Sequence, residues 1–342
     1  MSAYFLRRFL LLIPTFFGIT FLVFTITRFV PGGPIDQMMM QMAAQSGEVA
    51  SGGGNAQSMV EIPEQAMEAL KAHYHLDQPF FVAYAYWLAD LVRLDLGDSY
   101  KYNEPVIGLI VARFPISIYF GLTGFLLAYL VCIPLGILKA IHHGSPFDFA
   151  SSVLVFIGYS IPGWALGAVL LVLFGGGSFW DIFPLGGFRS EGWADFPLHK
   201  KILDQLHHTI LPVISYSVGS FATLTVLMKN SLMENLGADY VRTAFAKGLT
   251  ERQVIVGHAL RNSLIPIATG LGSAIGLVMA GSYLIEVVFN IDGIGYLGYT
   301  SIVGRDYAVV MGILVINTLL ILVGNILSDV LYVLIDPRIR FT

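Results

Sequence analysis

The chain has 342 residues, of which 56% are hydrophobic and 12% are charged, and its formal net charge is −4. Soluble domains carry about 25% charged residues, so this composition excludes an ordinary soluble protein and indicates a membrane protein. The single cysteine, Cys132, lies in an apolar run, which predicts a buried thiol and no intramolecular disulfide.

The first predicted element is a membrane helix within residues 1–30. Residues 9–30 supply about twenty apolar positions, enough for a hydrocarbon core of ~30 Å. The run is too long for a cleaved signal peptide, and Arg28 and Pro31 follow it in place of a small-residue cleavage site. Pro31-Gly32-Gly33-Pro34 is expected to end the helix.

Residues 31–112 form a polar segment outside the membrane. Its part 37–58 is rich in Met, Gln, Gly, Ala and Ser, so we expect it to be mobile, and its methionines are expected to make apolar contacts more readily than a metal site. Helices are predicted after Pro63 and after Pro79, the second with aromatic side chains suited to a membrane interface.

Residues 113–342 are predicted to be a five-helix core. The apolar runs that predict these spans are 116–138, 151–174, 210–228, 264–288 and 309–335. Pro134-Leu135-Gly136 is expected to break the first of them, and Pro162-Gly163 the second. The fold class is therefore an all-α integral membrane protein with six transmembrane helices.

Residues 229–262, between two of these spans, read as two short helices joined by a hinge. Asp239 is predicted to be an N-cap, Lys247 suits a helix C-terminus, and Gly248 suits the left-handed position after it. Thr250 to Gln253 is a capping-box pattern that restarts a helix. On pattern alone, an ordinary polar loop is the competing interpretation.

The distribution of Lys and Arg predicts the orientation. Six spans put both termini on one side, and that side carries ten cations in short segments: Arg7, Arg8, Lys139, Lys229, Arg242, Lys247, Arg252, Arg261, Arg338 and Arg340. The other nine are spread over much longer segments. The positive-inside rule therefore predicts that both termini and residues 229–262 are cytoplasmic.

Two acidic residues lie near apolar surroundings and are candidates for a pathway or an interface. Glu286 is near the end of one span and Asp329 lies inside another. For Glu286 the alternative is a structural carboxylate, and for Asp329 it is an ion pair with a C-terminal arginine. Residues 293–298 satisfy Gly-x-Gly-x-x-Gly, but they follow a membrane span and not a strand, so we expect a tight turn and no dinucleotide site.

Enzyme chemistry is not indicated. The sequence shows no Ser-His-Asp grouping, no His-Glu-x-x-His and no nucleotide-binding Gly-x-x-x-x-Gly-Lys-Ser/Thr loop. The adjacent His207 and His208 are expected to be interfacial side chains and not metal ligands. We therefore predict no catalytic residue, no metal site and no ATPase site in this chain.

The run Asp239–Leu249 resembles the coupling loop of ABC importer permeases. Gly248 is at its family position, whereas Arg242-Thr243-Ala244 stands where the broad family has Glu-Ala-Ala, and Arg261 stands where it has Pro. The first departure is usual in the oligopeptide/dipeptide/nickel branch, whose B-type subunits the chain resembles over nearly its whole length. The narrower resemblance is to Yej-type permeases for microcin C and peptides, and these runs carry it: residues 31–34, 144–148, 176–178, 183–185 and 336–339.

This resemblance implies a type I importer permease, located in the bacterial inner membrane and working by alternating access. It implies four kinds of partner: a second permease subunit, two ABC ATPase domains that bind ATP and Mg, a periplasmic peptide-binding protein and membrane lipid. It assigns ATPase coupling to seven residues: Asp239, Tyr240, Arg242, Thr243, Ala244, Lys247 and Gly248. The cargo is expected to be a peptide or peptide-like compound, and the sequence does not separate peptides from microcin-like compounds, nickel complexes or glutathione.

The alternative from another functional class is an ion-gradient-driven secondary transporter or a channel. Such a protein would favour inverted repeats and several polar residues at mid-membrane, and the sequence shows neither clearly.

Overall fold

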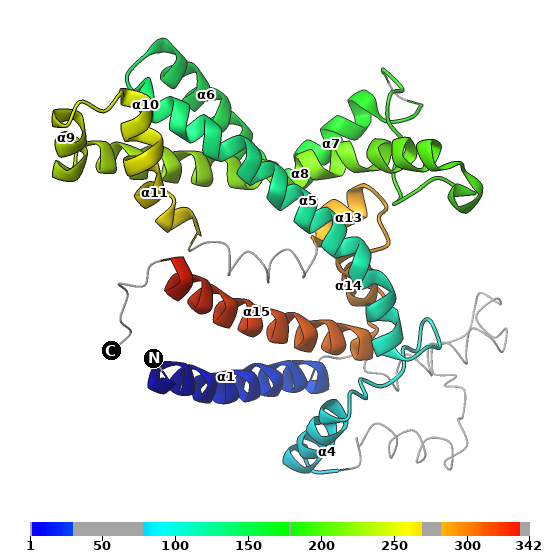
Figure 1. Ribbon diagram of the computed structural model, residues 1–342. Helices are drawn as coiled ribbons and strands as arrows, with labels where there is room; N and C mark the ends of the chain where they lie inside the picture. The colour runs from blue at the N-terminus through cyan, green and yellow to red at the C-terminus, as the bar shows by residue number, and fades with distance from the viewer. Residues whose placement is uncertain (1, 30–77, 178, 269–281, 336–342) are drawn as a thin grey trace, which may run out of the picture. The chain divides into compact units, whose positions relative to one another are not determined.

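The computed structural model describes residues 2–29, 78–177, 179–268 and 282–335 (Figure 1). Every regular element in these ranges is a helix, which confirms the predicted all-α class. Three helices are long and apolar enough to cross a membrane: α5 (Val106–Ile141), α8 (Leu198–Leu236) and α15 (Tyr307–Ile335). The bent pair α6 (Pro146–Ser160) and α7 (Gly163–Phe174) makes a fourth if it is counted as one span.

The structure describes only parts of the remaining predicted spans. α1 (Ser2–Phe29) contains the first, but its apolar stretch Leu10–Ile26 is shorter than those of the three helices above. Of the predicted span 264–288, residues 269–281 lie outside the described residues, and α13 (Tyr283–Val288) is its last part. Residues 37–58 and the helix expected after Pro63 also lie outside them, so a total of six spans stays a prediction.

The predicted break of α5 at Pro134-Leu135-Gly136 is wrong, because the helix continues through Pro134 to Ile141. Proline removes one backbone hydrogen bond, but apolar membrane helices tolerate this when a neighbouring helix supports them. Here the neighbour is α8: a Cβ on Gly136 would lie 2.6 Å from the Cβ of Met228, so the glycine lets the two helices approach closely.

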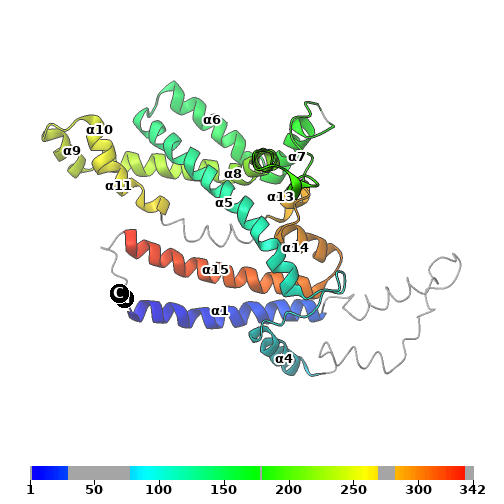
Figure 2. The ribbon, with the colours of Figure 1, turned by 45° about the vertical axis from the view of Figure 1, so that its right-hand side comes forward.

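The predicted break at Pro162-Gly163 is confirmed. α6 and α7 are bent by 96° at this point, with Pro162 at the N-cap of α7, and Figure 2 shows the two helices leaving the break in different directions. A Cβ on Gly163 would lie 2.4 Å from the carbonyl oxygen of Ser215 in α8, so only glycine fits between the bend and that helix.

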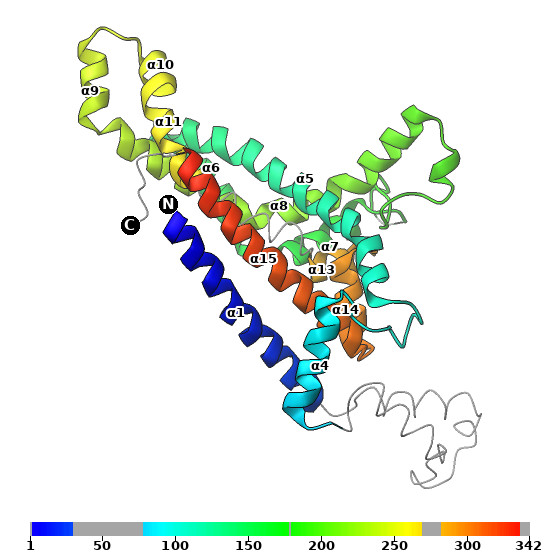
Figure 3. The same ribbon diagram turned by 60° about the horizontal axis from the view of Figure 1, so that its bottom comes forward.

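The described residues divide into two compact units. The first contains residues 1–9, 113–296 and 319–342, and α8 is its central element because α6, α7, α11 (Leu260–Ser263) and α13 all contact it. At the C-terminal end of α8 the chain forms α9 (Asp239–Ala246), α10 (Glu251–Val254) and the π-helical turn Ile255–Ala259, which leads into α11 (Figure 3). Near the other end of α8, residues 175–197 form a loop containing the 3-10 turn Trp193–Asp195.

The second unit contains residues 10–112 and 297–318. In it α4 (Phe80–Val92), the helix predicted after Pro79, packs on α1 through rings around Phe24. α14 (Ile294–Val303) enters this unit and is followed by Asp306, which is fully buried and accepts a hydrogen bond from Ser99 at 2.5 Å. Tyr100 also donates to the carbonyl of Gly304, so two hydrogen bonds join residues 95–105 to the start of α15.

Candidate functional site

Residues 229–262, which we call the coupling segment after the role that the family resemblance implies, have one buried face and one exposed face. Val241 and Ala244 of α9 are buried in an apolar cluster. The other buried members of this cluster are Ala140, Met228, Leu232, Val254, Ala259 and Ile267. At the two edges of this buried face, Tyr240 on one side and Phe245 on the other are 39% and 47% exposed. The helix is therefore anchored by apolar packing while it presents two aromatic side chains to a partner or to solvent.

The start of α9 differs from the prediction. Asp239 is not the N-cap: Ala238 occupies that position, and Asp239 is the first helical residue. Its side chain is almost fully exposed and forms an ion pair of 3.7 Å with Arg242, which is itself 76% exposed. A pair so exposed contributes about 0–1 kcal/mol, so both charges are free to meet a partner.

The end of α9 confirms the prediction. Lys247 is the C-cap and Gly248 follows in the left-handed region with φ of +82°. The N–H of Gly248 donates to Phe245 and the N–H of Leu249 donates to Ala244, which together make a Schellman motif. Leu249 packs against the apolar cluster, so the hinge has a defined geometry.

The predicted restart of the helix is also confirmed. The backbone N–H of Thr250 donates to Oε1 of Gln253 at 3.0 Å, and α10 begins at Glu251. The π-helical turn Ile255–Ala259 was not predicted. Past it, Ser263 and Ser231 of α8 donate to each other's carbonyl oxygens at 3.3 and 3.0 Å, which fastens α11 to α8.

Of the seven residues assigned to coupling, all lie in or next to α9. Six of them, all but Ala244, have exposed side chains or an exposed backbone. The Thr243 hydroxyl donates back to the carbonyl of Asp239, and the Tyr240 hydroxyl donates to Asn235 at 2.6 Å. The second bond ties α9 to the last turn of α8.

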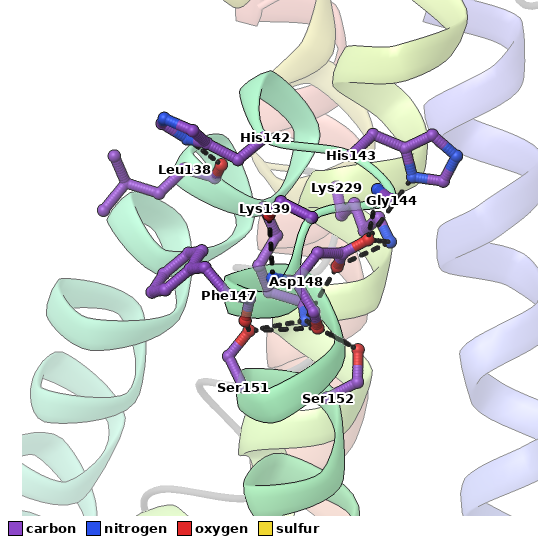
Figure 4. A network of polar contacts seen from close by, with 11 residues as sticks. Leu138, Lys139, His142, His143, Gly144, Phe147, Asp148, Ser151, Ser152 and Lys229 are labelled. Atoms are coloured by element: carbon purple, nitrogen blue, oxygen red, sulfur yellow. Dashed lines mark hydrogen bonds and ion pairs between the residues drawn. The ribbon is translucent and has the colours of Figure 1, made fainter.

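A buried charged network links α8 to the turn between α5 and α6 at Lys229, the first residue of the coupling segment, and sequence reasoning missed it (Figure 4). Lys229 of α8 donates to both carboxylate oxygens of Asp148 at 2.8 Å, and Lys139 of α5 lies 3.1 Å from the same carboxylate. The exposed fractions of the Lys139, Asp148 and Lys229 side chains are 2%, 9% and 15%. We call these three residues the Asp148 hub.

The hub holds a tight turn in place. Ser145 caps α6 by accepting from the N–H of Asp148, and the N–H of Gly144 donates to the Asp148 carboxylate. The Lys229 ammonium, with support from Gly144 and Lys139, keeps the pKa of Asp148 well below its usual range despite burial. The signal available in the sequence was a lysine at the end of an apolar run, which requires a buried partner.

Glu286 is fully buried in α13 and its contacts are to donors. Ser117 of α5 and Tyr216 of α8 donate to it at 2.9 and 3.2 Å, and the N–H groups of Tyr296 and Ser282 donate at 2.8 and 3.4 Å. The carboxylate thus joins α5, α8 and the start of α14. This favours the structural alternative over a direct role in the pathway.

The glycines of the Gly-x-Gly-x-x-Gly run explain this cradle. A Cβ on Gly293 would lie 2.5 Å from Oε2 of Glu286 and 2.6 Å from Oγ of Ser117. A Cβ on Gly295 would lie 2.9 Å from the same carboxylate oxygen. The predicted tight turn is confirmed at Gly293, whose N–H donates to Ile291, whereas Gly295 and Gly298 lie inside α14; the absent side chains of Gly293 and Gly295 leave room for the buried glutamate.

Asp329 lies in α15 and is 5% exposed. The arginines expected to pair with it, Arg338 and Arg340, lie outside the described residues, so that pairing stays a prediction. Neither Glu286 nor Asp329 lies in the coupling segment, since they belong to α13 and α15.

The structure brings together a Ser-His-Asp group that the sequence did not reveal. Ser190 donates to Asp204 at 2.5 Å and lies 3.2 Å from Nε2 of His208, whose Nδ1 lies 3.0 Å from the carbonyl of Gly187. In a catalytic triad the carboxylate orients the histidine, whereas here it binds the serine. The arrangement fastens the loop to α8 and does not activate a nucleophile.

Comparison with known proteins places these features in a family. Residues 132–341 match the binding-protein-dependent transport system inner membrane component family. The chain is 39% identical to the peptidoglycan transport system permease protein YejB of Agrobacterium fabrum, covering 100% of this chain and 99% of that protein. It is 40% identical to the inner membrane ABC transporter permease protein YejB of Escherichia coli O157:H7, with the same coverage.

A more distant relative and a solved structure agree with this. The oligopeptide transport system permease protein AppB of Bacillus subtilis is 35% identical, with 100% of both chains covered. A chain of the inward-facing MetNI methionine ABC transporter matches with a TM-score of 0.51 and 17% identity, covering 67% of this chain and 97% of that one, which supports the fold alone. The chain therefore belongs to the family of inner membrane components of binding-protein-dependent transport systems.

Proposed function

We propose that this chain is the transmembrane permease subunit of an ATP-driven importer that takes up peptides or peptide-like compounds by alternating access. The observation that carries the proposal is the coupling segment. Its inner face is anchored in the apolar cluster at the end of α8, and its outer face presents Tyr240, Arg242 and Phe245. A separate subunit that contacts this face can move α8 because the anchor is shared.

The proposal requires four kinds of partner: a second permease subunit, two ABC ATPase domains, a periplasmic peptide-binding protein and membrane lipid. ATP and Mg are assigned to the ATPase domains, since this chain has no nucleotide-binding loop of the Gly-x-x-x-x-Gly-Lys-Ser/Thr type. On α6, Phe149 is 74% and Leu154 70% exposed, an apolar surface suited to lipid or to a second permease.

Six spans with both termini in the cytoplasm complete the proposed topology. The positive-inside count supports this orientation, and it places the coupling segment on the side where ATP is available. The segment 31–112 and the loop 175–197 then lie in the periplasm, where a binding protein delivers cargo.

The proposed cargo class follows from the relatives. The names of the AppB and DppB relatives specify oligopeptide and dipeptide transport, and that of the Agrobacterium YejB relative specifies peptidoglycan transport. Peptides and peptide-bearing compounds, microcin C among them, share an amide backbone that one pathway can accommodate. ATP binding shifts the transporter between states only by its differential affinity for them, so the coupling face must contact the ATPases differently in each state.

The test compares two exposed aromatic residues in the complete transporter, reconstituted in vesicles with its binding protein. Phe245→Ala removes an exposed ring from the coupling face, and Tyr86→Ala removes one of similar exposure, 51% against 47%, from α4. We expect Phe245→Ala to weaken co-purification of the ATPase and to reduce ATP-dependent peptide uptake, while Tyr86→Ala changes neither. Peptide uptake driven by an ion gradient without ATP would refute the proposal in favour of a secondary transporter.

A further inference from the structure

The Asp148 hub joins three helices at the start of the coupling segment, whose first residues still belong to α8. Lys139 is in the last turn of α5, Asp148 is in the first turn of α6, and Lys229 is in α8, two turns before its end at Leu236. All three belong to one compact unit. Any displacement of the end of α8 therefore acts directly on the turn between α5 and α6.

The end of α8 is in turn tied to α9. The Tyr240 hydroxyl donates to Asn235, and Met228 and Leu232 of α8 share the apolar cluster with Val241 and Ala244 of α9. Lys229 thus lies next to Met228, with the hub and the cluster on consecutive residues of α8. A push on α9 reaches both.

The charges of the hub exceed what stability alone requires. Asp148 needs one cation, yet two ammonium groups lie on it, and both lysines are largely buried. The second cation of the group, Lys139, is accommodated by the Asp148 carbonyl and by the hydroxyls of Ser151 and Ser152 at 2.7–2.9 Å. Burying an extra charge is unfavourable, and a well-packed apolar side chain commonly stabilises such a position as well or better.

An ion pair of this kind resists sliding more than apolar packing does. Apolar side chains exchange neighbours when helices slide, whereas a shift of Lys229 along α8 would leave a buried carboxylate and a buried ammonium without full compensation. The bidentate contact, 2.8 Å to each oxygen, holds only in one register. The turn between α5 and α6 must consequently follow α8.

We propose that Lys229, Asp148 and Lys139 are positioning residues for transport: their buried ion pairs make the α5–α6 turn move together with α8 when the coupling segment is displaced. This rests on the proposed function, since it concerns how a push from an ATPase is distributed within the permease. None of the three residues contacts the cargo or the ATPase in this scheme.

The decisive variant is Lys229→Met in the complete transporter. It removes the link to α8 but leaves Asp148 paired with Lys139, so the buried site becomes neutral and the chain still folds. We expect ATP hydrolysis to persist while the peptide imported per ATP hydrolysed falls by about tenfold, the order of effect that a hydrogen bond to a charged group supports. Lys229→Arg keeps the charge and restores most of the ratio.

The matched control is Asp204→Asn, which removes another buried, hydrogen-bonded carboxylate on α8. Asp204 is 12% exposed and lies 25 residues from Lys229 in sequence, about 37 Å along the helix axis. We expect it to lower the melting temperature without changing the ratio of peptide to ATP.

The outcomes separate the two proposals. If Lys229→Met lowers uptake and hydrolysis equally, or lowers only the amount of assembled protein, the hub is a structural anchor and the positioning role is refuted. If the unmodified transporter imports no peptide with ATP, the proposed function itself fails, whatever the hub does.

Discussion

Gly293→Ala tests whether the buried Glu286 cradle depends on the absence of a side chain. The added Cβ would lie 2.5 Å from Oε2 of Glu286 and 2.6 Å from Oγ of Ser117. Ordinary contacts begin at 3.4 Å, so the carboxylate must retreat by about 0.9 Å. The backbone of Gly293 does not have a positive φ, so the cost comes from this contact alone.

The retreat breaks hydrogen bonds that the structure identifies. The Tyr296 N–H donates to the same oxygen at 2.8 Å, and lengthening that distance by nearly 1 Å takes it beyond hydrogen-bonding range. A lost bond to a charged group costs about 1.5–3 kcal/mol, and overpacking costs about 1–3 kcal/mol. We expect a destabilisation of about 3 kcal/mol or more.

The assay is thermal unfolding of the purified chain in detergent, followed by tryptophan fluorescence. The matched control is Gly219→Ala in α8, where no atom lies within 4 Å of the added Cβ and alanine improves helix propensity by up to about 1 kcal/mol. Gly293→Ala should lower the melting temperature by several degrees, while Gly219→Ala leaves it unchanged or raises it. Equal melting temperatures for the two variants would show that the cradle is not tight.

A second substitution identifies the clashing group. Glu286→Asp shortens the side chain by one methylene and withdraws the carboxylate from Gly293. The double variant Gly293→Ala with Glu286→Asp should therefore be less destabilised than the sum of the single variants. Additive effects would mean that the cost of Gly293→Ala arises elsewhere.

Three other predictions concern the hinge and the buried acids. Gly248→Ala forces alanine to φ of +82°, which costs about 1–2 kcal/mol, and should reduce coupling of uptake to ATP hydrolysis. Gly177→Ala imposes the same strain at φ of +78° in the loop after α7 and should leave coupling unchanged; equal uptake per ATP in the two variants would contradict the role of Gly248 as a hinge. Asp148→Asn should destabilise the chain by about 3–5 kcal/mol, and because Lys229 depresses the folded pKa of Asp148, the difference in melting temperature from the unmodified chain should narrow as the pH falls below about 4. Burial raises the pKa of Asp306, so the pH dependence at this position is opposite to that at Asp148. The free energy of unfolding of the unmodified chain relative to Asp306→Asn should fall as the pH rises above about 4, and an increase in this difference would refute the prediction.

Features set by neighbouring residues could be predicted from the sequence. Gly248 ends α9 because glycine adopts a positive φ without strain, and Thr250 with Gln253 restarts the helix through contacts three residues apart. The bend at Pro162 follows for the same reason, since proline blocks helix continuation locally.

Features that depend on residues far apart in the chain could not be predicted from the sequence. Lys229 and Asp148 are 81 residues apart and Ser117 and Glu286 are 169 apart, so no local pattern connects them. The continuity of α5 through Pro134 depends on its close contact with α8 at Gly136, which the sequence of α5 does not contain. The wrong N-cap prediction for Asp239 has another cause. Acidic residues are favoured both at the N-cap and in the first turn of a helix, and these positions are adjacent.

Asp148 and Glu286, two of the buried carboxylates of the first unit, bind their partners in different ways, and this difference affects how the unit can move. Asp148 is held mainly by two lysine side chains from α5 and α8, with the Gly144 N–H and the His143 ring also in contact, whereas Glu286 is held by two hydroxyls and by the backbone N–H groups of Tyr296 and Ser282. The ion pairs keep the α5–α6 turn in one register on α8, so that the turn and α8 move together, whereas the backbone N–H groups around Glu286 move only with their own chain. If the proposed push from an ATPase acts on α9, the helices should pivot about the Glu286 cradle, with the larger displacement at the Asp148 hub.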